Sequence, residues 1–154
     1  MRSRTRYIVI CGFISLVVLA WFFWDSPQRA IRTVLREGAA AIEAKNMANS
    51  MSRVSRRYLD ENGLNYLAVH RALAVAFERF QRIDVKLGDG TVKITGDKAA
   101  AKVALQVLVW VQRDTEYIIG KPGVPDLVTI NLRKEPLAWR VISVNGINIS
   151  RFGL

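Results

Sequence analysis

Few residues of this chain have the type and spacing that chemistry at a protein site requires. His70 is the only histidine, and histidine is the commonest general base in enzymes. A single histidine holds a metal only with cysteine or carboxylate partners at ligand spacing, and no such pattern surrounds it. We therefore predict no metal and no cofactor, and we expect His70 to be a partly exposed helical residue beside Arg71.

Other candidate residues are explained by turns and packing. Gly88, Gly90 and Gly96 lie between short apolar runs, and no helix follows them to receive a phosphate. Trp110 and Trp139 lie on expected strands. They belong either to the core or to the mouth of a ligand pocket, where an apolar ligand would stack on them.

The chain is strongly basic. It has 23 lysines and arginines against 13 acidic residues, a formal net charge of +10. Such a balance favours anionic lipid headgroups, nucleic acid or an acidic partner. The basic residues are dispersed, however, and do not alternate with aromatic residues as single-strand binding surfaces require. We therefore expect no nucleic-acid binding, and a solvated basic surface is the simpler interpretation.

Residues 7–24 have the properties of a membrane-spanning segment. Their sequence, YIVICGFISLVVLAWFFW, contains no charged residue, and a helix of this length covers about 27 Å, close to the hydrocarbon thickness of a bilayer. Arg2, Arg4 and Arg6 lie directly before the segment, and Asp25 follows it. The positive-inside rule then predicts a cytoplasmic tail at 1–6 and a domain in the periplasm, anchored in the bacterial inner membrane.

Two other kinds of segment, a cleavable signal peptide and a buried helix, are also rich in apolar residues. A cleavable signal peptide would end at a small-x-small site, and Val18-Leu19-Ala20 is a passable one, but four aromatic residues continue the apolar run beyond it. A buried helix of a soluble protein would carry polar residues along one face, whereas Ser15 is the only such residue here. An uncleaved anchor explains both observations.

The rest of the chain predicts three helices followed by strands. Apolar residues at helical spacing predict a helix over 28–45, a short second helix capped by Asn46, and a third helix over 64–80. On the third helix we expect five side chains to be buried: Leu67, Leu73, Val75, Phe77 and Phe80. Alternating patterns then predict strands at 83–87 and 92–94, joined by an Asp89-Gly90 hairpin and followed by a turn at Gly96-Asp97. A third strand is predicted at 99–113, followed by a long loop at 115–125 and by two further strands at 127–133 and 138–148. Connections this short require antiparallel strands. The expected fold is α+β, with a strongly curved sheet wrapped over the helices.

This order of elements resembles the nuclear transport factor 2-like superfamily, the cone-shaped domain shared with ketosteroid isomerases. Two segments carry the resemblance. Residues 58–64, Tyr-Leu-Asp-Glu-Asn-Gly-Leu, resemble the stretch where the second helix of that family ends and its third begins. Residues 137–142, Leu-Ala-Trp-Arg-Val-Ile, resemble its final strand. The resemblance covers residues 27–149 and implies one cone-shaped domain with an internal pocket.

The resemblance also implies two candidate catalytic residues. In ketosteroid isomerases and related cyclases, the pocket holds an acidic base and a hydrogen-bonding acid. By position, Asp60 corresponds to the base and Tyr58 to the donor. A capped turn over Asp60-Glu61-Asn62-Gly63 explains the same residues, so we assign no catalytic residue from the sequence.

The superfamily contains enzymes, ligand-binding modules and scaffolds, so the fold does not select a function. Our first expectation is a membrane-tethered, periplasm-facing binding or assembly module without catalytic activity, which contacts an inner-membrane protein or itself. Its tail, span and cone resemble the VirB-type inner-membrane subunit of type IV secretion, although this sequence is shorter and lacks the Asn-Pro-x-Gly motif of that family. The alternatives are a small pocket enzyme of the isomerase or cyclase type and a carrier of a small apolar ligand.

Overall fold

The computed structural model of the protein describes residues 26–147. Within this range no helix is both long and apolar enough to cross a membrane. The predicted anchor at 7–24 and the predicted tail at 1–6 lie outside the described residues.

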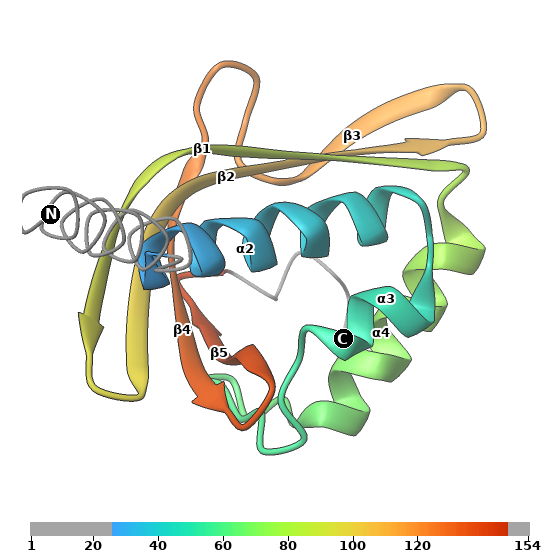
Figure 1. Ribbon diagram of the computed structural model, residues 1–154. Coiled ribbons are helices and arrows are strands. Elements are labelled where there is room, and N and C mark those ends of the chain that lie inside the picture. Colours follow the sequence, from blue (N-terminus) through green and yellow to red (C-terminus); the bar gives the residue numbers. More distant parts are fainter. Residues whose placement is uncertain (1–25, 148–154) are drawn as a thin grey trace, which may run out of the picture.

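Three helices open the described part of the chain: α2 (Pro27–Glu43), α3 (Met47–Ser52) and α4 (Tyr66–Arg79) (Figure 1). Proline in the first turn suits the start of α2, because that position needs no N–H donor. Asn46 and Asn65 cap α3 and α4, since their side-chain oxygens accept the N–H groups of Asn49 and Ala68, each at 3.0 Å. The three predicted helices are confirmed, with small differences at their ends.

Five antiparallel strands follow: β1 (Arg82–Thr95), β2 (Lys98–Val111), β3 (Asp114–Ile119), β4 (Asp126–Glu135) and β5 (Ala138–Asn145). The order in the sheet is β1-β2-β4-β5. Because β1 pairs along the whole of β2, the other edge of β2 is shared, by β4 over its first part and by β3 over its last. The predicted α+β class and antiparallel sheet are confirmed.

Two predictions about the strands are wrong. Asp89-Gly90 is not a hairpin, because β1 continues through it and stays paired with β2, with an irregular register between Leu87 and Gly90. A bulge separates two alternating runs just as a turn does, so the sequence pattern of the two is the same. The predicted loop at 115–125 in fact begins with β3, and only residues 120–125 leave the sheet. The turn at Gly96-Asp97 is confirmed as the connection between β1 and β2.

The sheet curves around α2 (Figure 1). Alternate residues of β2, from Ala99 to Val109, are buried on its concave side. They form one core with Ile31 and Val34 of α2. Trp139 of β5 is 6% exposed and belongs to the same core.

Helix α4 packs differently from α2, because none of its residues is buried. Leu67 and Val75, which we predicted to be core residues, are 62% and 54% exposed. This prediction is wrong, because α4 does not pack its apolar face tightly against the sheet.

Candidate functional site

An apolar cavity of about 400 Å³ lies between α2, α4 and the concave face of the sheet. Its volume is within the range of about 300–1,000 Å³ that is usual for small-molecule sites. Helices and sheet supply apolar walls, among them Leu35, Ala39 and Ile42 of α2, Val69, Ala72, Leu73 and Ala76 of α4, and Val85, Leu105, Val107 and Ile130 of the sheet.

The cavity explains why α4 has no buried residue. Its apolar face lines the cavity, so side chains such as Ala72 and Ala76 meet empty space rather than the sheet. Val75 lines the cavity while remaining 54% exposed, so the cavity opens to solvent beside α4. Atoms beside a void lack partners on one side and forfeit dispersion attraction. An apolar occupant would restore those contacts.

The polar side chains that line the cavity do not come from α2 or from the strands. They come from α3, from the connection between α3 and α4, and from the end of α4: Ser50, Arg53, Tyr58, Asp60, Asn62 and Arg79. The guanidinium group of Arg53 pairs with the carboxylate of Glu37 on α2 at 2.7 Å. The lining residues of α2 and of the strands are all apolar or glycine.

The structure brings the two candidate catalytic residues together in the cavity wall. The Tyr58 hydroxyl donates to Asp60 Oδ2 at 3.1 Å, and Asp60 Oδ1 accepts the N–H groups of Asn62 and Leu64, each at 2.9 Å. Burial, and then the adjacent Asp60 carboxylate, raise the pKa of Tyr58 above its ordinary value. These three hydrogen bonds occupy three of the roughly four lone-pair sites of the Asp60 carboxylate and leave about one for a substrate proton.

Trp110 and Trp139 are not among the residues that line the cavity. Trp139 is a core residue. Trp110 is partly exposed and alternates with buried Val109 on β2, so it lies on the convex face of the sheet. There the guanidinium carbon of Arg82 lies 4.6 Å from the centre of the indole ring.

His70 is exposed on α4 and also lies outside the cavity. In the part of the chain that the structure describes, no three histidine, cysteine or acidic side chains gather as a metal site would need.

Sequence reasoning missed the role of α4 and of four polar lining residues, Ser50, Arg53, Asn62 and Arg79. The signal for α4 was present: small Ala72 and Ala76 are four residues apart, on the face where a packed helix normally carries large side chains. Arg53, Asn62 and Arg79 had no such signal, because nothing local distinguishes them from exposed surface residues.

Comparison with known proteins agrees with this architecture. No protein-family model and no curated protein matches the sequence. Among solved structures, the scytalone dehydratase-like protein of Novosphingobium aromaticivorans superposes with a TM-score of 0.67 at 9% identity, over 77% of this chain and 80% of that one. A nuclear transport factor 2-like superfamily protein of Salmonella enterica gives 0.61 at 13% identity, over 77% and 89%.

A third similar structure belongs to a longer protein. Bd1075 of Bdellovibrio bacteriovorus superposes with a TM-score of 0.64 at 12% identity, over 79% of this chain but only 40% of that one. Identities this low show the fold alone. The described domain therefore has a nuclear transport factor 2-like fold, and the resemblance seen in the sequence is confirmed at that level.

Proposed function

We propose that this protein is a membrane-tethered binding module that holds a small apolar molecule in its cone without transforming it. The observation that carries the proposal is the cavity, whose walls on α2, α4 and the sheet are apolar. A ligand that buries about 250 Å² of apolar surface would gain about 6 kcal/mol from that burial, which offsets the entropy cost of association.

The tether is the second part of the proposal. Residues 7–24 would hold the domain at the bacterial inner membrane, with the amino terminus in the cytoplasm and the domain in the periplasm. The charge-free segment and the arginines before it support this arrangement. Apolar molecules collect in bilayers, and a tether raises the effective concentration of the domain for whatever the membrane contains. An apolar cavity near a bilayer is therefore well placed to exchange its ligand.

The same confinement favours contacts with proteins. We include in the proposal an inner-membrane partner, or a second copy of this chain, as the recipient or source of the ligand. Crosslinking in intact membranes tests this part. Crosslinks to a defined membrane protein or to a second copy are expected, and their absence would remove the partner from the proposal.

The ligand itself is tested by filling the cavity. Ala72→Leu with Ala76→Leu adds side-chain volume on the cavity wall of α4 without loss of helix propensity. The matched control, Ala68→Leu with Ala74→Leu, adds the same volume on the same helix away from the cavity. Native mass spectrometry of the full chain from membranes should show bound mass in the wild type and the control but not in the filled variant. A wild-type chain without bound mass would contradict the proposal.

A pocket enzyme of the isomerase or cyclase type is the second candidate, because Tyr58 and Asp60 both line the cavity. One of the similar structures is also described as scytalone dehydratase-like. We favour binding because Asp60 already accepts three hydrogen bonds. Native mass spectrometry of the wild type and of Asp60→Asn separates the two candidates. Bound mass that accumulates only in Asp60→Asn would indicate turnover, whereas the same mass in both proteins supports binding.

A further inference from the structure

A second hollow lies outside the cone, between α3, α4 and the start of β5. Its volume is about 360 Å³, and its charged and aromatic wall consists of Arg56, Tyr66, His70 and Arg140. Two methionines, Met47 and Met51, supply apolar surface beside them. None of these residues lines the apolar cavity. We call this hollow the arginine groove.

The two guanidinium groups of the arginine groove are held in place before any ligand arrives. The Arg56 guanidinium carbon lies 4.9 Å from the centre of the Tyr66 ring, a stacking contact that leaves its N–H donors free. Arg140 forms an ion pair with Glu135, in which Nε lies 3.1 Å from a carboxylate oxygen. Glu135 is fixed in turn by the hydroxyl of fully buried Ser55 at 2.5 Å. Donors that are already oriented lose less entropy on binding.

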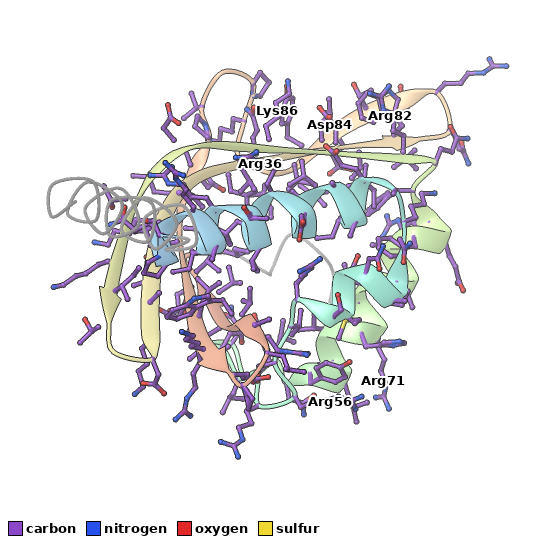
Figure 2. The ribbon with its side chains drawn as sticks, viewed as in Figure 1. Arg36, Arg56, Arg71, Arg82, Asp84 and Lys86 are labelled. Atoms are coloured by element: carbon purple, nitrogen blue, oxygen red, sulfur yellow. The ribbon has the colours of Figure 1, made fainter. Side chains whose placement is uncertain are left out.

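The charge of the groove is positive. No acidic side chain lines it, and among the described residues no carboxylate pairs with Arg56. Glu135 offsets the charge of Arg140, since its carboxylate lies 3.1 Å from Nε of that side chain. Figure 2 shows Arg56 on the side of the molecule that carries α3 and α4.

We propose that the arginine groove binds the phosphate group of an organic phosphate ester. Arginine presents a planar fork of N–H donors that matches phosphate oxygens, and such charge-assisted hydrogen bonds are stronger than neutral ones. His70 and the hydroxyl of Tyr66 add donors on the same wall. The groove is larger than one phosphate, and Met47 and Met51 would contact the organic part of the ester. The ester is either a phospholipid headgroup or a soluble metabolite, which share this chemistry.

Calorimetry on the full chain in a nonionic detergent, at constant ionic strength, tests the proposal. Glycerol 3-phosphate represents a soluble ester, dihexanoyl-phosphatidylglycerol represents a lipid headgroup, and acetate is the carboxylate control. We expect at least one of the two esters to bind more tightly than acetate. The tighter of the two esters identifies the source of the phosphate.

Variants show whether the groove is responsible. Arg56→Gln should weaken ester binding about tenfold, and Arg56→Lys, which keeps the charge but loses the fork, should weaken it several-fold. The matched control is Arg71→Gln, which removes the same charge from exposed α4 next to His70 but outside the groove, and should change affinity less than about twofold. Equal losses in Arg56→Gln and Arg71→Gln, affinity for acetate equal to that for the esters, or no ester binding would each overturn the proposal.

Discussion

At the scale of single residues, the Tyr58–Asp60 pair combines a structural and a chemical role. Asp60 holds the turn between α3 and α4 through the N–H groups of Asn62 and Leu64, and its second oxygen accepts the buried Tyr58 hydroxyl. A buried phenol beside a carboxylate keeps its proton, because ionisation would place two negative charges together in a poorly solvated site. Tyr58 is therefore a hydrogen-bond donor at the cavity and not a base.

The raised pKa of Tyr58 has a consequence for alkaline stability. The unfolded chain releases this proton near the ordinary tyrosine value of about 10, whereas the folded protein keeps it. The contribution of Tyr58 to the free energy of unfolding is thus complete below about pH 10 and is lost as the pH rises toward the folded pKa. We expect Tyr58→Phe, which cannot ionise, to lose less stability than the wild type above about pH 10, by up to about 1.4 kcal/mol per pH unit.

Urea unfolding at a series of alkaline pH values measures this difference. At neutral pH, Tyr58→Phe should be less stable by about 1 kcal/mol, because the hydrogen bond to Asp60 is gone. Tyr117→Phe removes a phenol on β3, outside the cavity, and serves as the control. Parallel stability curves for the wild type and Tyr58→Phe would show that the burial of Tyr58 does not hold its proton.

At the scale of elements, the irregular register in β1 gives the long strand its bend. It lies where Gly88 and Gly90 pass close to β2, and a Cβ atom built at Gly90 would be 2.1 Å from the carbonyl oxygen of Lys102. Bulges increase local twist and curvature. The curvature lets β1 and β2 arch over α2, which Figure 1 shows. The shape of the cavity therefore depends on Gly90, which does not itself line the cavity.

Two glycine-to-alanine variants should have effects of opposite sign. Gly90→Ala should destabilise the protein by about 2 kcal/mol or more, because backbone atoms of β2 would have to move. Gly38→Ala, inside α2, meets only the Arg53 Cγ atom at 4.0 Å and should stabilise the protein by about 0.5–1 kcal/mol through helix propensity. Denaturant midpoints at constant m-value measure both effects. A Gly90→Ala variant as stable as the wild type would disprove the close approach of the two strands.

At the scale of the whole molecule, α4 separates two hollows with different chemistry. Its Ala72 and Ala76 face the apolar cavity, whereas Tyr66 and His70 face the arginine groove. Neither hollow shares a lining residue with the other. A membrane surface offers both apolar molecules and phosphate groups, so the two proposed sites are consistent with one location for the protein.

The proposed tether is tested by comparing two chains. The full chain should stay with bacterial membranes through a carbonate wash and keep its amino-terminal sequence, because an apolar span of 18 residues is stable in lipid. A chain that begins at residue 26 should be recovered in the soluble fraction. Protein recovered in the soluble fraction with Trp21 as its first residue would instead indicate cleavage. A reporter fused after Leu154 that is active only in the cytosol would contradict the proposed orientation.

The sequence by itself determined that three helices precede a run of strands, although it divided β1 in two and missed β3. Helical spacing before residue 81 and alternation after it are local properties, and Asn46 acts as a cap through neighbours three residues away. Short connections then required antiparallel pairing. These observations were enough for the α+β class and for the resemblance that the solved structures confirm at the level of the fold.

The tertiary structure decided what those elements enclose. Whether Asp89-Gly90 forms a turn or a bulge depends on the pairing of β1 with β2, residue by residue. Whether the apolar face of α4 meets the sheet or a void depends on the curvature of a sheet built from distant segments. An apolar face looks the same in a sequence in either case, because periodicity records which side of a helix avoids water and not what lies opposite.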